Sequence, residues 1–247
     1  FKDVVVVYGL SQIKERQKLK KEKYKASNKE KRKYSHFVLE DNENFIVLNK
    51  PSGIPVQSGT KSFKNMIDIL KDTEYFKDKK PYIVHRLDKE TSGVMIVAKN
   101  REYAQLFTSL FRIRKIHKTY LAVTHGQVNK DINLLQDNLI IYENNKKIVQ
   151  KAISYLKIIN SNNKYSLLEL KPITGRKHQL RKQLYNIGNP VVGDDKYFIK
   201  IEKNKLKNKN LMLHAHKVKF MINNVKYNFE AKYNDHFSNF IKKNIKS

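Results

Sequence analysis

Short apolar runs separated by polar turns dominate the chain from about residue 36 onward, and this pattern limits the fold more than any other feature. Runs such as FIVLNK, VMIVAK, TYLAVTHG and YSLLELKP have strand length and are rich in β-branched and aromatic residues. Strand often follows strand directly, with about eight or nine strands against about three or four helices. This order predicts an α+β fold rather than a doubly wound α/β fold.

Local signals predict particular helices and turns. Helical spacing of apolar residues indicates helices at 62–72 and 180–187, and Gly188 is a suitable C-cap for the second. A further helix is expected over 100–113, with the asparagine at its start as N-cap. The pair Asn223-Asn224, between two apolar runs, predicts a hairpin turn.

The chain carries a strong excess of positive charge, with 51 Lys and Arg against 23 Asp and Glu and a formal charge of +28. Such an excess suits a polyanionic partner such as nucleic acid. Part of the charge can also reflect codon bias, because Lys, Asn and Ile are all abundant. The size of the excess favours the nucleic-acid interpretation.

The positive charge is densest over residues 11–34, where few apolar residues are available to bury a face. We therefore predict that residues 1–36 are a solvated basic arm or linker and that 37–247 form one domain. The arm either contacts phosphates or acts as a spacer. The apolar run at 4–7 has the character of a strand left from a truncated module.

Several classes of protein and site are excluded by what the sequence lacks. The chain contains no Cys, which excludes disulfides, thiolate metal sites and cysteine nucleophiles. No apolar run approaches the ~18–20 residues of a membrane span, and the first residues show no signal-peptide pattern. We therefore expect a cytoplasmic protein that acts without a membrane.

The segment HRLDKETSG holds the strongest candidate for chemistry, Asp88. It follows the β-branched run YIV, so YIVHRLD is predicted to be a strand that leads into a polar loop. Strand-to-loop junctions often present side chains to ligands. On such an extended segment Arg86 and Asp88 would face the same side. From these residues alone, a structural salt bridge between the two is favoured over a catalytic carboxylate.

HRLDKETSG resembles the HRLDxxTSG signature of the RluA/RluC/RluD family of RNA pseudouridine synthases. Further segments resemble motifs of that family in the same order, namely LNKPSGIPV, KTYLAV, PITGRKHQLR, NPVVGDDKY and LMLHAHKVKF. The resemblance covers roughly residues 37–232, and its several ordered motifs make it specific. One departure is Lys177, where the family usually has threonine.

The resemblance implies an α+β fold with a single catalytic domain, built on a mixed, mostly antiparallel sheet flanked by helices and loops. It implies an enzyme like the RluC branch, which converts uridines of large-subunit ribosomal RNA to pseudouridine. The base is cut from ribose, rotated and rejoined through carbon 5, so no cofactor and no metal are expected. Structured RNA is the expected partner of a monomer with no obligatory protein partner, and the run at 4–7 is then a remnant of an RNA-binding module.

Three alternatives stay open beside this interpretation. One is a synthase that acts on transfer RNA. Another is an inactive RNA-binding protein of the same fold. A third is a glycosidase-like hydrolase, which would need a second catalytic carboxylate.

The resemblance also assigns roles to individual residues. Asp88 is the catalytic carboxylate, which either attacks the ribose or abstracts a sugar proton to form a glycal. Arg181 forms a salt bridge with Asp88 and so favours its ionised form. Tyr120 stacks on the target base and takes part in removing the proton from carbon 5. Arg86 occupies the space that the extruded base leaves.

Further residues are predicted to contact the substrate. Leu180 either packs against the base or belongs to the core. Lys118 should face the same side of its strand as Tyr120, two residues later. Arg176 is expected to be a phosphate contact or a structural one. Lys50 is expected to shape the pocket floor together with the proline that follows it.

The other notable histidines and carboxylates are expected to be structural. His85 should orient the backbone at a strand end. His214 and His216 share a strand face at a spacing that can bind metal, but no Cys or acidic cluster accompanies them. Asp194 and Asp195 invite a second-carboxylate hypothesis, whereas the resemblance favours a structural turn.

Overall fold

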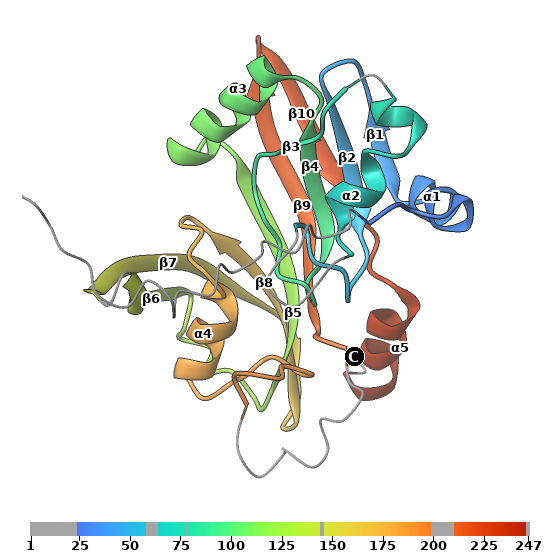
Figure 1. The fold of residues 1–247 in the computed structure, drawn as a ribbon. Coiled ribbons are helices and arrows are strands. Elements are labelled where there is room, and N and C mark those ends of the chain that lie inside the picture. Colours follow the sequence, from blue (N-terminus) through green and yellow to red (C-terminus); the bar gives the residue numbers. More distant parts are fainter. Residues whose placement is uncertain (1–23, 58–63, 78, 144–145, 199–209, 246–247) are drawn as a thin grey trace, which may run out of the picture.

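A computed structural model describes residues 24–57, 64–77, 79–143, 146–198 and 210–245 of the chain (Figure 1). Within these residues ten strands join into one sheet. They are β1 (Val38–Asp41), β2 (Phe45–Lys50), β3 (Tyr82–Ile83), β4 (Ser92–Ala98), β5 (His117–His125), β6 (Leu134–Glu143), β7 (Lys146–Ser161), β8 (Tyr165–Pro172), β9 (Leu213–Ile222) and β10 (Val225–Glu230). The helices are α1 (Asn28–Ser35), α2 (Met66–Leu70), α3 (Arg101–Arg112), α4 (Gln179–Asn186) and α5 (Asp235–Asn244), with a short 3-10 helix η2 (Glu74–Phe76).

The sheet is mixed and mostly antiparallel, as predicted. Its strand order is β1-β2-β4-β9-β5-β8-β7-β6, with β10 beside β9 and β3 beside β4. Every pairing between the described strands is antiparallel except that of β4 with β9. The parallel pair joins the two halves of the sheet, and Figure 1 shows β4 and β9 side by side at its centre.

Gly93 makes the central pairing of β4 with β9 possible. Its φ is +111°, and a Cβ atom there would lie 2.2 Å from the backbone oxygen of Ala215 on β9. No side chain fits into that space, and the backbone conformation itself favours glycine. The glycine that ends HRLDKETSG therefore lets the two strands meet directly behind the loop that carries Asp88.

Three apolar clusters hold the helices against the sheet. One lies under α4 and α5 and includes Leu168, Leu184 and Phe237. A second gathers side chains of α1, α2, β2 and β4, and a third, rich in aromatic rings, packs under α3 around Phe45 and Phe107. Each fully buried side chain of this size contributes roughly 1.5–3 kcal/mol. The site described below therefore lies between well-packed elements.

The capping and turn predictions are confirmed at three places. The side chain of Asn100 accepts a hydrogen bond from the backbone N–H of Tyr103 and starts α3. Gly188, with φ +81°, follows the end of α4. Asn223 and Asn224 have φ values of 48° and 61° and connect β9 to β10. The helix expected over 62–72 is shorter than predicted and spans Met66–Leu70, while 62 and 63 lie outside the described residues.

The end of the predicted basic arm forms a helix, α1, instead of a solvated linker. Ser27 and Glu30 form a reciprocal capping box at its start. Tyr34 and Ala26 are both 8% exposed and pack into the second apolar cluster. The few apolar residues of the segment are thus enough to anchor it. Residues 1–23 of the arm lie outside the described residues, and the domain boundary at residue 36 stays a prediction.

Three other elements differ from the sequence predictions. The strand expected over YIVHRLD ends at Ile83, because the chain leaves the sheet there and follows an irregular path to β4. Strand β6 was not predicted, since polar residues interrupt its apolar pattern. Helix α5 was not predicted either, although Asn234 caps it and its apolar face packs into the first cluster.

Candidate active site

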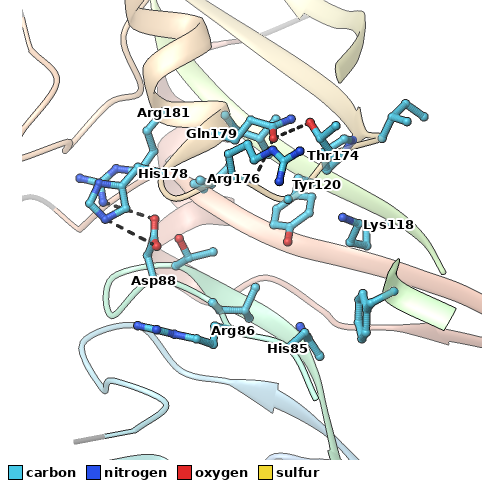
Figure 2. Close-up of a pocket in the computed structure, with 18 of the residues that line it drawn as sticks. His85, Arg86, Asp88, Lys118, Tyr120, Thr174, Arg176, His178, Gln179 and Arg181 are labelled. Atoms are coloured by element: carbon cyan, nitrogen blue, oxygen red, sulfur yellow. Dashed lines mark hydrogen bonds and ion pairs between the residues drawn. The ribbon is translucent and has the colours of Figure 1, made fainter. Parts of the chain in front are cut away.

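A pocket of about 780 Å³ opens where the two halves of the sheet meet (Figure 2). The loop between β3 and β4, the start of β5, the loop between β8 and α4, and the end of α3 surround it. All the predicted site residues except Lys50 line this pocket. They are Asp88, Tyr120, Arg181, Arg86, Lys118, Leu180 and Arg176. The tertiary fold thus gathers residues from distant parts of the chain, such as Arg86 and Arg181.

Asp88 lies at the pocket wall with 29% of its side chain exposed. Its Oδ2 atom is 3.5 Å from Nη1 of Arg181, and its Oδ1 atom is 3.7 Å from Nε2 of His178. Figure 2 shows both contacts as dashed lines. Among the described residues Asp88 makes no ion pair with Arg86, whose side chain is exposed. The interpretation of these two residues as a structural salt bridge is therefore wrong, because the segment is not an extended strand.

Arg181 has a stronger partner than Asp88. Its Nε and Nη2 atoms bind the two carboxylate oxygens of Asp194 at 2.7 and 2.6 Å, and Nη2 also lies 3.0 Å from Asp195. The Arg181 side chain is 3% exposed. Burial acts to lower the pKa of this guanidinium, but the hydrogen bonds and charge of Asp194 outweigh it and raise the pKa above its ordinary value. Arg181 is thus a fixed cation with one amino group directed at Asp88.

Asp194 was expected to form a structural turn, and its hydrogen bonds agree with that expectation. Its Oδ1 atom accepts from the backbone N–H groups of Lys196 and Tyr197. The carboxylate side chain is completely buried. Sequence reasoning missed its second contact, the bidentate pair with Arg181, which fixes the orientation of the guanidinium. The adjacent acids in NPVVGDDKY give no signal that one of them faces α4.

His178 is a further site residue to which the sequence gave no role. It precedes α4 in the left-handed backbone conformation, with φ 53° and ψ 30°. Its Nδ1 atom lies 3.0 Å from the hydroxyl of Tyr197, and its Nε2 atom faces Asp88. Burial lowers the pKa of His178, and the charge of Asp88 opposes this in part. The imidazole is therefore neutral at neutral pH and can act as a hydrogen-bond partner of the carboxylate.

Tyr120 and Lys118 both line the pocket from β5, so the prediction that they face the same side is confirmed (Figure 2). The register of β5 with β9 shifts here, because Thr119 pairs with Lys217 and Tyr120 with Ala215, which leaves one extra residue on β9. Burial, with the charge of Asp88, raises the pKa of Tyr120, so its phenol is protonated at neutral pH. Burial also lowers the pKa of Lys118 to about 8. Its ammonium makes no ion pair within the described residues.

Leu180 and Arg176 lie on the α4 side of the pocket. Leu180 is 6% exposed and belongs to the first apolar cluster, which confirms its place in the core. It also lines the pocket, and its contact with the base stays a prediction. The Nε atom of Arg176 donates to the backbone oxygen of Lys151 at 3.3 Å. Gln179 fixes the loop that carries Arg176 by accepting from its backbone N–H at 3.0 Å and from Thr174 at 2.7 Å.

Lys50 does not line the pocket, which corrects the prediction of a substrate contact. Its side chain is completely buried, and its ammonium donates to the backbone oxygens of Pro51, Ile54 and Lys89 at 2.9, 2.9 and 3.0 Å. Burial lowers its pKa to about 7. Lys50 therefore ties the loop after β2 to the loop that carries Asp88, and it supports the site from behind.

The structural roles expected for three histidines are confirmed. The Nε2 atom of His85 accepts from the backbone N–H of Ile96 at 2.8 Å, and burial lowers the His85 pKa to about 3. Both ring nitrogens of His214 are engaged, with Ser92 and with the backbone oxygen of Ala231. His216 contacts the same backbone oxygen at 3.1 Å. The part of the chain that the structure describes contains no cluster of three or more potential metal ligands.

Comparison with known proteins was made on sequence and on structure. A family model described as RNA pseudouridylate synthase matches residues 44–186. Ribosomal large subunit pseudouridine synthase C of Rickettsia felis is 37% identical over 173 residues, which is 65% of this chain and 55% of that protein. Synthase D of Borreliella burgdorferi is 33% identical over 196 residues, which is 73% of this chain and 60% of that protein. The chain thus spans little more than half the length of these relatives.

A solved structure also resembles this one. The human protein RNA Pseudouridylate Synthase Domain Containing 4 has a TM-score of 0.74 and 25% sequence identity, and the match covers 86% of this chain and 94% of that one. The expected fold class is therefore confirmed. No helix within the described ranges is long and apolar enough to cross a membrane.

Proposed function

Because the chain belongs to the RNA pseudouridylate synthase family, we propose that it isomerises uridine to pseudouridine in RNA, with ribosomal RNA as its substrate. One observation carries the proposal. The carboxylate of Asp88 contacts both the guanidinium of Arg181 and the imidazole of His178, in a pocket that Tyr120 and Leu180 also line. A carboxylate held in this way can act on a ribose while a base occupies the rest of the pocket.

The reaction exchanges one bond between base and ribose for another. The bond from N1 to C1′ breaks, the base rotates, C5 bonds to C1′, and the proton on C5 is lost while N1 gains one. In one route the ionised Asp88 attacks C1′ and is later displaced by C5. In the other it removes the proton from C2′ and a glycal forms. Both routes need Asp88 as a carboxylate, and the guanidinium of Arg181 lies 3.5 Å from it.

The walls of the pocket suit an extruded uracil. Tyr120 offers an aromatic face, and stacking of a base on such a ring contributes ~1–3 kcal/mol. Leu180 offers an apolar contact that is already packed against the core. The base must first leave its helix, which costs a few kcal/mol and least where the RNA is unpaired. Arg86, exposed at the rim, is suited to occupy the vacated space, and Lys118 and Arg176 to contact the nucleotide.

The competing proposals make different use of the same residues. A protein that only bound RNA would gain nothing from burying Arg181 against Asp194 beside a carboxylate. A glycosidase-like hydrolase would need a second carboxylate near the sugar, and Asp194 is engaged by Arg181. Ribosomal RNA is favoured over transfer RNA because the relatives described above carry names that refer to the large ribosomal subunit. We further propose that the protein is a monomer in the cytoplasm, and that residues 1–36 form an arm ahead of a catalytic domain at 37–247.

Asp88→Asn is the direct test. The substitution keeps the size of the side chain but removes its nucleophilic and basic character. We expect pseudouridine formation to fall below detection while RNA affinity stays within about twofold, because one charge among many is changed. Pseudouridine mapping of ribosomal and transfer RNA from cells with and without the gene identifies the target. Appreciable turnover by the Asn variant would remove Asp88 from the catalytic role.

A further inference from the structure

Four non-glycine residues with positive φ occur in the part of the chain that the structure describes, namely Arg114, His178, Asn223 and Asn224. The two asparagines form the β9–β10 hairpin turn, a position where this conformation is common for Asn. His178 contacts Asp88 in the pocket. Arg114 also lines the pocket, and nothing in the reaction described above accounts for it.

Arg114 follows Ile113, the C-cap residue of α3, and so occupies the position where glycine is usual. Its backbone N–H bonds the oxygen of Phe111 at 3.2 Å, and that of Lys115 bonds the oxygen of Leu110 at 2.9 Å. These two bonds define a Schellman motif, in which the residue in the left-handed conformation is most often glycine. An arginine with φ 61° is strained there. Strain that the fold does not require points to a use for the side chain.

The side chains of Arg114 and of Arg112, two residues earlier, are both exposed, and both line the pocket. Neither forms an ion pair with a carboxylate among the described residues. Arg112 lies in the last turn of α3, where a cation interacts favourably with the helix dipole. That effect accounts for Arg112 but not for an arginine in the strained position that follows.

The α3 end faces other cations across the pocket. Helix α3 packs against β3 and β4 in one half of the sheet, and α4 packs against β6 in the other half (Figure 1). Arg176, in the loop before α4, lines the same pocket. A nucleotide in the pocket would therefore have guanidinium groups on both sides. Guanidinium groups bind phosphate with two parallel hydrogen bonds, which suits a strand that enters and leaves the site.

We propose that Arg112 and Arg114 form a phosphate-binding rim that holds the RNA backbone beside the target uridine. The proposal rests on the proposed function for the identity of the ligand. The net charge of +28 and the continuity of the rim with the pocket favour RNA over an acidic protein. The strain at Arg114 is then retained because glycine would satisfy the helix end but could not bind a phosphate.

Arg114→Gly separates this role from a structural one. Glycine relieves the strain, so we expect a melting temperature equal to that of the parent or up to about 4 °C higher. Binding to a fluorescently labelled RNA hairpin with uridines in its loop should weaken. The slope of log K against log salt should fall in magnitude by roughly 1, and by about 2 in Arg112→Ala/Arg114→Gly. With a slope change of 1, the ratio of parent affinity to variant affinity falls about fourfold when the salt concentration rises from 50 to 200 mM.

A matched control removes equal charge elsewhere. Lys219 and Lys226 are exposed on β9 and β10 and do not line the pocket. Lys219→Ala/Lys226→Ala should leave the slope within about 0.5 of the parent value. Arg114→Lys, which keeps the charge, should retain most of the slope.

Three results would overturn the inference. One is an unchanged slope in Arg114→Gly. Another is an equal loss of slope in the Lys219/Lys226 control, which would make the effect one of net charge. The third is a loss of affinity for polyglutamate in Arg114→Gly that is as large as the loss of affinity for RNA. That result would assign the rim to acidic chains. Failure of the proposed function is distinguishable, because it appears as a parent protein that binds RNA but forms no pseudouridine.

Discussion

Asp194→Asn tests whether the buried pair with Arg181 organises the site. Asn is nearly the same size and can still accept one hydrogen bond from the guanidinium, but it loses the charge and the bidentate contact. The Asp194 side chain is fully buried and Arg181 is 3% exposed, so water cannot replace the lost interaction. Breaking one partner of a buried pair costs about 3–5 kcal/mol. Because Arg181 keeps Asp88 and Asp195 as neighbours, we expect about 3 kcal/mol.

That loss of stability has a measurable scale. In a domain of this size 1 kcal/mol shifts the melting temperature by roughly 2–4 °C, so a decrease of roughly 6–12 °C is expected. The guanidinium should also move toward Asp88, since the contact there is 3.5 Å long and can shorten. A displacement near 1 Å in a catalytic contact costs on the order of 100-fold in rate. Single-turnover release of tritium from RNA that contains 5-tritiated uridine measures this step.

Asp195→Asn is the matched control. Asp195 contacts the same nitrogen of Arg181 at 3.0 Å, but its side chain is 67% exposed. An exposed ion pair contributes about 0–1 kcal/mol, so both melting temperature and rate should change little. Equal effects of the two substitutions would refute the argument, because burial is the difference between them. An Asp194→Asn protein with the stability and rate of the parent would refute it as well.

Two further predictions concern the sheet and the pocket cation. Gly93→Ala should destabilise the fold by about 3 kcal/mol or more, because its Cβ would lie 2.2 Å from a backbone oxygen of β9. Gly188→Ala is the control, because its Cβ would meet open space. Denaturant melts of that variant should show only the cost of positive φ, about 1 kcal/mol. Burial lowers the pKa of Lys118 from 10.5 to about 8, so between these values the unfolded chain binds more protons and the contribution of Lys118 to stability rises with pH. RNA affinity should fall between about pH 7 and 9, where the folded-state ammonium of Lys118 loses its charge, and a Lys118→Gln variant with an equally steep fall over that range would contradict this.

Much of the site could be predicted from the sequence because its motifs are short and contiguous. HRLDKETSG, KTYLAV and PITGRKHQLR place Asp88, Tyr120 and Arg181 in identifiable segments, and all three residues line one pocket. Lys50 was misassigned, because a lysine in a motif carries no sign of whether its ammonium faces solvent or backbone oxygens. Its three carbonyl partners come from two loops separated by more than 30 positions.

The sequence by itself determined the alternation of strands and turns, the helix caps at Asn100 and Gly188, and the residue types available for chemistry. These features depend on neighbours in the chain, since periodicity, capping and turn conformation are local. The tertiary structure decided which charges meet. Asp194 reaches Arg181 from a loop beyond α4, and Arg114 reaches the pocket because α3 ends beside it. Such pairings depend on how the two halves of the sheet pack through β4 and β9, and no local pattern of residues encodes that distance.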